Sequence, residues 1–289
     1  MKSSFPYLVD IGLGTYCPLA GTKCKVPCYA SSRSDGKCAD EYFVSNTLKK
    51  ALLEANVFEV VFGGLEPTLF KADSNLYPID YILKSYKKSN FKVGITTRNY
   101  NAYKLKNFEN IFSNINTCAI SANTLEDLKE AFKLAKEICN LDCPSRPSVY
   151  IQNIFGLHDY ESFKEFCLQF KREKEKNYWL FSGLTFLGYK TYGLGSTYTP
   201  FEMPDNWIQF VKDLGINFGV DSIMASKWRD KLVDAGVERY YLVGQEGGSS
   251  CYVDALNKSV KPSSFTDEEY KIKEVDWNGE NFLKAFGKF

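Results

Sequence analysis

Histidine, net charge and long apolar runs are all scarce in this sequence, and each scarcity excludes a class of protein. His158 is the only histidine, which excludes a zinc enzyme built on several histidine ligands. The 36 basic and 35 acidic side chains leave a formal charge of +1, which argues against a nucleic-acid-binding protein that depends on a basic field. No apolar run approaches the roughly 18–20 residues of a membrane span, and the amino terminus lacks the apolar stretch of a secretory signal. We therefore expect a cytoplasmic protein with neither a membrane nor a nucleic acid as its partner.

The composition is that of a folded chain with a substantial core. Its 289 residues fit one large α/β barrel or two small domains. Hydrophobic residues make up 44% of the chain and charged residues 25%, which excludes an intrinsically disordered protein. No internal repeat, low-complexity tract or interdomain linker interrupts the sequence.

Nine cysteines carry most of the chemical information in the chain. Their odd number, together with the missing secretory signal, disfavours a secreted disulfide scaffold. In a reducing compartment, clustered cysteines indicate metal or redox chemistry instead. Cys139 and Cys143 form a weaker pair at the end of a predicted helix, for which a structural role is favoured.

Three of the cysteines, Cys17, Cys24 and Cys28, lie within the twelve residues CPLAGTKCKVPC. The glycine and prolines of this segment predict a loop, which is the backbone form that brings three thiolates at these spacings around one centre. Three thiolates without a fourth protein ligand leave one coordination position open, through which a metal centre contacts a small molecule. The alternative is three unrelated thiols in a cysteine-rich chain.

Apolar runs and helical periodicity alternate along most of the chain. Strands are predicted at 7–14, 58–64, 91–97, 117–122, 148–154, 179–187, 216–220 and 240–243, and helices at 39–55, 78–88, 124–139, 159–171, 204–214 and 222–235. This alternation is typical of an α/β fold in which crossover helices connect parallel strands, most economically an open or closed (β/α) barrel. Residues 1–235 are expected to form this unit, and residues 236–289, rich in Gly, Ser and Pro after 245, an irregular C-terminal extension packed on it.

Polar and glycine residues gather where the predicted strands end. They are the cysteine loop after the first strand, the segment 63–68 after the second, Thr96 and Thr97, Ser121, and Gln152 with Asn153. In (β/α) barrels the chemistry lies at the carboxyl ends of the strands. Lys190, Asp221 and Glu246 follow later strands and are candidates for contact with a substrate, although a solvated surface position is an equal alternative for each.

These motifs together resemble the radical S-adenosylmethionine (SAM) superfamily. The last cysteine of the loop is followed by Tyr29 and Ala30, and the second strand ends in FGGLEPTL (62–69), similar to the family's glycine-rich GGEP segment. The chain departs from the commonest family pattern in having six and three residues between its cysteines, Pro27 before the last cysteine, and Leu65 where a third glycine is common. The resemblance spans about residues 7–235 and implies a partial (β/α)6-type TIM barrel.

The resemblance also implies a cofactor and a role for each motif. Cys17, Cys24 and Cys28 would ligate a 4Fe–4S cluster, whose fourth iron binds SAM. Gly63 and Gly64 would receive the methionine end of SAM, with Glu66 helping to set that loop, while Thr97, Ser121 and Gln152 would hydrogen-bond its ribose or carboxylate. Reductive cleavage of SAM would generate a 5′-deoxyadenosyl radical for hydrogen abstraction from a peptide or small metabolite. An electron donor such as flavodoxin or ferredoxin would be the partner.

Two alternative hypotheses for the function of the same residues stay open. A protein of the same fold would keep the iron–sulfur cluster, or bind SAM, without catalysis. Alternatively, an unrelated α/β enzyme would use the cysteines for a structural zinc site. The glycine-rich GLGS (193–196) lacks the strand–helix context of a phosphate-binding loop.

Overall fold

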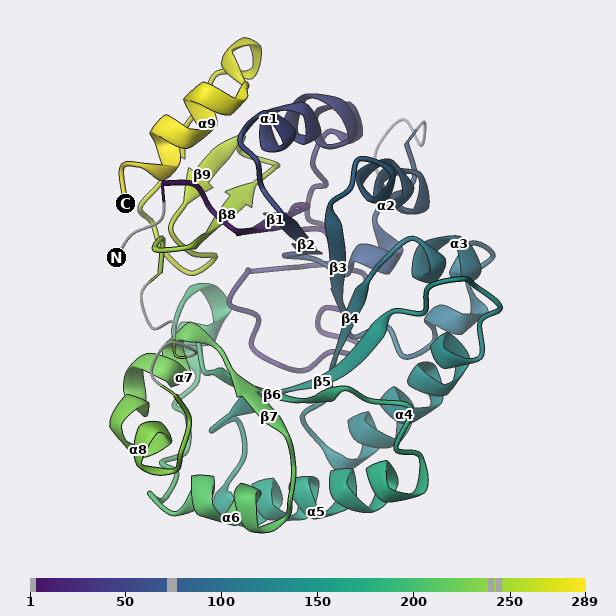
Figure 1. Cartoon of the computed structure of the whole chain (residues 1–289), viewed down its shortest axis with the longest axis vertical. Coiled ribbons are helices and arrows are strands. Elements are labelled where there is room, and N and C mark those ends of the chain that lie inside the picture. Colours follow the sequence, from purple (N-terminus) through teal and green to yellow (C-terminus); the bar gives the residue numbers. More distant parts are fainter. Residues whose placement is uncertain (1–3, 72–76, 239–241, 243–245) are drawn as a thin grey trace.

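The computed structural model describes residues 4–71, 77–238, 242 and 246–289 (Figure 1). Within these residues one ten-stranded sheet has the order β10-β9-β8-β1-β2-β3-β4-β5-β6-β7. The strands are β1 (Leu8–Gly12), β2 (Glu59–Gly63), β3 (Lys92–Thr97), β4 (Thr117–Ser121), β5 (Ser148–Phe155), β6 (Gly183–Gly188), β7 (Phe218–Val220), β8 (Ser250–Asp254), β9 (Ser259–Lys261) and β10 (Tyr270–Lys271). The seven strands predicted up to residue 220 are therefore all present.

The strands from β8 through β1 to β7 run parallel, and only β9 and β10 pair antiparallel at one edge. Helices cover the outside of the curved sheet (Figure 1). They are α1 (Lys49–Glu54), α2 (Ile79–Lys88), α3 (Phe108–Ser113), α4 (Leu125–Cys139), α5 (Tyr160–Lys176), α6 (Trp207–Asp213), α7 (Ser222–Lys227), α8 (Arg229–Asp234) and α9 (Gly279–Phe286). The predicted α/β class is confirmed, and the mostly parallel sheet is compatible with a partial barrel.

Local sequence signals explain where several helices begin. Thr124 and Asp127 form the expected capping box at the start of α4, and Asp159 caps α5 by accepting a hydrogen bond from Ser162 N. The predicted helix 39–55 starts as a π-helical segment, Phe43–Leu48, that continues into α1. Helix α3 was not predicted, because its six residues are too short for a clear helical period.

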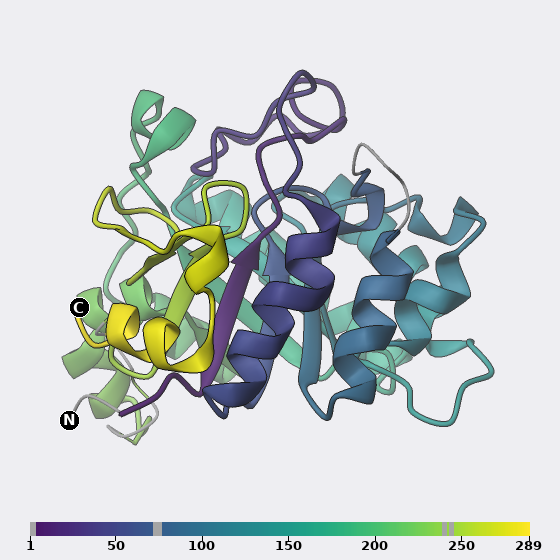
Figure 2. The same ribbon diagram turned by 90° about the horizontal axis from the view of Figure 1, so that it is seen from above.

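The C-terminal segment corrects one prediction, because it is not irregular. It contributes β8, β9, β10 and α9, and β8 pairs in parallel with β1, from Leu8 opposite Ser250 to Gly12 opposite Asp254. Helix α9 lies beside α1, where Gly279 N donates to Glu54 Oε2 at 2.8 Å (Figure 2). The predicted strand 240–243 falls outside the described residues except for Leu242, which belongs to no strand. Among the described helices, none is both long and apolar enough to cross a bilayer.

The two faces of the strands differ sharply in exposure. Side chains on the outer face pack against the helices and are fully buried, among them Val9, Ile11, Val60, Phe62, Ile120, Phe186 and Val253. The alternate side chains form the inner face, which points away from the helices, and many of them are only half-buried: Val61, Thr96, Ala119, Ser121, Tyr150, Gln152, Thr185, Leu187 and Tyr252. Solvent therefore reaches the inner face, unlike the packed interior of a closed TIM barrel.

Candidate functional site

The cysteine loop, residues 13–40, leaves β1 and crosses the carboxyl ends of the strands (Figures 1 and 2). The loop folds back on itself, because Cys17 N donates to Arg33 O at 2.8 Å and Cys24 N donates to Leu19 O at 2.9 Å. The returning part of the loop is hydrogen-bonded to the end of β2, where Ser32 Oγ donates to Gly64 O at 2.7 Å. The loop is thus fixed to the same rim of the sheet as the glycine segment.

Cys17, Cys24 and Cys28 are all half-buried, and they act electrostatically on different parts of the chain. Burial raises the pKa of the Cys17 thiol, and the nearby charges of Glu66 and Cys24 raise it further. Cys28 acts electrostatically on Tyr252 of β8. Cys17 is therefore within electrostatic reach of Glu66, which follows β2, and Cys28 of β8.

No three His, Cys, Asp or Glu side chains of the described residues lie close enough together to hold a single metal ion. A four-iron cluster is larger than one ion, so its ligands stand further apart than those of a zinc site. This observation therefore gives no support to the structural zinc alternative, and it does not bear on cluster binding.

Two consecutive glycines form the rim at the end of β2. A Cβ on Gly63 would meet no atom within 4 Å, so open space adjoins this residue. Gly64 turns the chain with a φ of +82°, a conformation that favours glycine, and a Cβ there would lie 2.9 Å from Gly12 Cα. The hydroxyl of Tyr252 occupies the position over Gly12 that a side chain would fill. The rim is consequently open at Gly63 and closed at Gly12 and Gly64.

Glu66 and Thr97, two of the predicted cofactor-binding residues, form a buried brace behind this rim. Glu66 is 4% exposed, and its Oε1 accepts hydrogen bonds from Thr68 N, from Thr68 Oγ1 and from Thr97 Oγ1 at 2.6 Å. Its Oε2 accepts from Arg98 N at 2.8 Å. Burial raises the pKa of Glu66, although these hydrogen bonds oppose the shift. The brace ties the end of β2 to the end of β3, and Thr97 lies on the outer face, away from the space beside Gly63.

Arg98 continues the brace toward β4. Its guanidinium donates to Asp127 Oδ2 at 2.6 Å, while its Nε is buried without a partner among the described residues. Burial works to lower the pKa of Arg98, but Tyr100, Asp127 and Cys24 outweigh burial and raise it. This cation therefore lies within electrostatic reach of the cysteine loop.

Ser121 and Gln152 lie side by side on the inner face, as partners in the register of β4 and β5. Both are half-buried, and no described residue shares a side-chain hydrogen bond with either. The backbone carbonyl of Ser121 accepts a hydrogen bond from Tyr100 Oη at 2.6 Å. Their side chains are thus free to contact a ligand, whereas Asn153, the neighbour of Gln152, is buried against Ala122 O.

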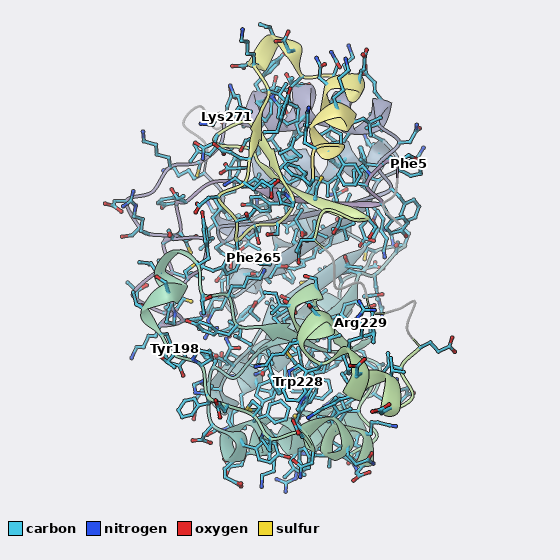
Figure 3. All side chains as sticks on the ribbon, turned by 90° about the vertical axis from the view of Figure 1, so that its left-hand side faces the viewer. Phe5, Tyr198, Trp228, Arg229, Phe265 and Lys271 are labelled. Atoms are coloured by element: carbon cyan, nitrogen blue, oxygen red, sulfur yellow. The ribbon has the colours of Figure 1, made fainter. Side chains whose placement is uncertain are left out.

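Lys190, which follows β6, joins three distant segments. Its ammonium lies 4.3 Å from the ring centroid of Tyr29 in the cysteine loop and 4.8 Å from that of Phe265 in the C-terminal segment, and it approaches Ser264 Oγ at 3.5 Å. Figure 3 shows Phe265 at the boundary between the yellow C-terminal segment and the green part of the chain. The aromatic contacts favour a cation at this position.

Carboxylates from three elements surround this lysine. Burial works to lower the pKa of Lys190, but Tyr29, Asp221, Asp10 and Glu246 outweigh burial and raise it. Asp221 also caps α7, because its Oδ1 accepts from Gly188 N and Met224 N, and Glu246 accepts from Ser222 Oγ. The three candidates after later strands, Lys190, Asp221 and Glu246, therefore gather in one place.

Asp10 was not predicted as a functional residue. It stands in the middle of β1 on the inner face, opposite Val61 of β2 and Tyr252 of β8. Solvent reaches its side chain, but the surrounding protein limits hydration of the carboxylate. This desolvation raises the pKa of Asp10 to about 6. A single charged residue within an otherwise apolar strand was the signal for it in the sequence.

Two further features singled out in the sequence are His158 and the glycine-rich GLGS segment. His158 borders a cavity of about 10 Å³, the size of one water, which Asn123 and Asn153 also line. Gly193, the first residue of GLGS, has a φ of +54° and packs so closely on Tyr29 O that a Cβ would lie 2.3 Å from it. This glycine lets the loop after β6 contact the cysteine loop.

Comparison with known proteins leaves the function open. No protein-family model matches the chain, and no curated protein matches it.

Proposed function

We propose that this protein is a radical SAM enzyme on a partial (β/α)6-type TIM barrel. The proposal depends on one observation above all. The loop that carries Cys17, Cys24 and Cys28 is hydrogen-bonded to Gly64, beside the open space at Gly63, at the carboxyl edge of a sheet whose inner face solvent reaches. The loop with the three thiols, the glycine rim and the accessible inner face thus adjoin one another.

The residues present fit the cofactor that the proposal requires. Thiolates are the ligands that iron–sulfur clusters take, so Cys17, Cys24 and Cys28 would hold three irons of a 4Fe–4S cluster. The open space at Gly63 leaves room for backbone contact with the methionine end of SAM. When bound, the cluster would supply an electron that cleaves SAM reductively, which gives methionine and a 5′-deoxyadenosyl radical.

The chain's own residues would orient the reactants and shield them from water. The brace of Glu66 and Thr97 fixes the glycine rim, so that its backbone is preorganised for SAM. Ser121 and Gln152 present free polar groups on the inner face, where the ribose or carboxylate of SAM would lie. Lys190 binds the cysteine loop to the C-terminal segment through Tyr29 and Phe265, which would keep the loop over the inner face.

Anaerobic reconstitution tests the proposal. The full-length protein, incubated with iron, sulfide and a reductant, should turn brown, and addition of SAM should yield 5′-deoxyadenosine, measured by liquid chromatography and mass spectrometry. Cys17→Ala, Cys24→Ala and Cys28→Ala should each abolish both results. Cys143→Ala, which changes a half-buried thiol outside the loop, is the matched control and should abolish neither.

The other readings predict different outcomes of the same experiment. A brown protein that leaves SAM intact would identify a non-catalytic iron–sulfur or SAM-binding protein. A colourless protein with bound zinc would identify a structural zinc site. The proposed enzyme further requires a one-electron donor, for which flavodoxin or ferredoxin would serve in the cytoplasm, and its substrate would be a peptide or small molecule.

A further inference from the structure

Charged residues are few on the inner face of the parallel strands, and two of them form an ion pair with each other. Glu59 and Lys92 lie at the amino end of the sheet, where Lys92 Nζ and Glu59 Oε2 are 3.2 Å apart. Glu59 is buried, and its carboxylate is neutralised by this lysine. Glu59 is thus a carboxylate on the inner face whose charge is compensated within the protein.

Asp10 differs from Glu59 in its exposure to solvent and in having no ion-pair partner among the described residues. Solvent reaches its side chain, and no described residue donates a hydrogen bond to it or forms a salt bridge with it. Lys190, Glu246 and Glu59 act on its charge, and limited hydration of the carboxylate together with the two glutamates favours its neutral form against the effect of Lys190. Asp10 thus presents to solvent, on the inner face, a carboxylate that is unpaired within the described part of the chain, unlike Glu59.

The region beside Asp10 already stabilises one cation. The ammonium of Lys190 lies between the rings of Tyr29 and Phe265, and its pKa is raised despite burial. Three carboxylates, of Asp10, Asp221 and Glu246, act on this one ammonium, so the region keeps an excess of negative charge when all are ionised. A second cation would find the same favourable electrostatic surroundings.

We infer that Asp10 is a specificity-determining residue and that the substrate carries a basic nitrogen, an ammonium or a guanidinium, which binds the Asp10 carboxylate on the inner face. This inference rests on the proposed function, since it names the substrate class of the same site. Val61 and Tyr252, the register neighbours of Asp10, would pack against the apolar part of such a substrate. The bound cation would supply the partner that Asp10 lacks.

Binding of a matched pair of small probes tests the inference without any iron chemistry. Benzylammonium and benzyl alcohol differ chiefly in charge, and each is titrated into the full-length protein at pH 8 and followed by ligand-observed NMR. The wild-type protein should bind benzylammonium about tenfold more tightly than the alcohol. Asp10→Asn should remove this preference, whereas Asp230→Asn, on the exposed surface of α8, should retain it.

Each contrary result is decisive. Equal binding of the two probes to the wild-type protein, or absence of binding, would overturn the inference without need of a variant. A preference that survives in Asp10→Asn would place the cation elsewhere and would overturn it as well. Since the titration needs neither iron nor SAM, a brown, SAM-cleaving protein without the preference would refute only this inference. A colourless protein that prefers the ammonium would refute only the proposed function.

Discussion

The outer and inner faces of the same strands differ in what their side chains do. On the outer face, Val9, Phe62 and Phe186 are completely buried against the helices. On the inner face, Asp10, Ser121 and Gln152 are reached by solvent and hold no side-chain hydrogen bonds to described residues. Because the two sets alternate residue by residue, stability and chemistry are separable along one strand. Substitutions on the outer face should cost folding energy, and those on the inner face should cost binding or activity.

The largest effect is expected on the outer face of β6. Phe186 is fully buried, and its ring contacts those of Phe163 and Trp207. Phe186→Ala should lower the free energy of unfolding by about 3–5 kcal/mol because it leaves a cavity. Leu187→Ala, one residue along on the half-exposed inner face, should cost only about 1 kcal/mol. Urea unfolding followed by circular dichroism measures both, and equal costs would contradict the distinction between the faces.

The next-largest loss of stability is expected at Glu66, whose buried carboxylate supports the glycine rim of Gly63 and Gly64. Glu66→Gln replaces an acceptor oxygen by an amide NH₂, so one of the four hydrogen bonds to the carboxylate is lost, at a cost of about 1–3 kcal/mol. The rim should then move, and affinity for SAM, measured by calorimetry on reconstituted protein, should fall. Glu59→Gln, a buried carboxylate at the other end of the sheet, is the control and should lower stability without lowering SAM affinity.

Asp10 should show the opposite sign of stability change. Its pKa in the folded protein, about 6, lies above the ordinary 3.8. Its protonation therefore stabilises the fold, fully below pH 3.8, and this contribution is lost as the pH rises through 6. Asp10→Asn should thus stabilise the protein at pH 8 by ~1 kcal/mol, a value reduced for its exposure to solvent. The gain should vanish in urea unfolding at pH 3.5; a variant equally stable or less stable at pH 8 would show that the carboxylate is no burden to the fold.

Local patterns predicted the outer face well and the inner face only in part. Apolar runs located seven strands, because the outer-face side chains of each strand must be hydrophobic to pack against the helices. The loop with Cys17 was predicted from its glycine and prolines, directly after the first such run. The pairing of β8 with β1 could not be predicted, because it joins residues about 240 apart in the chain and β8 has only five residues.

The positions of individual inner-face residues depend on strand phase, which changes with a shift of one residue. Thr97 was predicted to contact the cofactor, but Thr97 lies on the outer face in the brace with Glu66, and the neighbouring Thr96 lies on the inner face. Asp10 was predicted only as part of an apolar strand, because the sequence does not show which residues of that strand lie on the inner face. Composition identifies a strand, whereas only its pairing shows which side chains meet the ligand.

The smallest effect on stability, and the sharpest separation of the two faces, is expected at Gly63. A methyl group there would contact nothing within 4 Å, so Gly63→Ala should change the free energy of unfolding by less than about 1 kcal/mol. The same methyl would occupy the space assigned to SAM, and SAM affinity should fall about tenfold. Gly219→Ala, which adds a methyl to exposed β7 with no atom closer than 3.8 Å, should leave SAM affinity unchanged. If both variants bind SAM as the wild type does, the open space beside Gly63 is not where the cofactor lies, and the glycine rim would have to be understood as a turn alone.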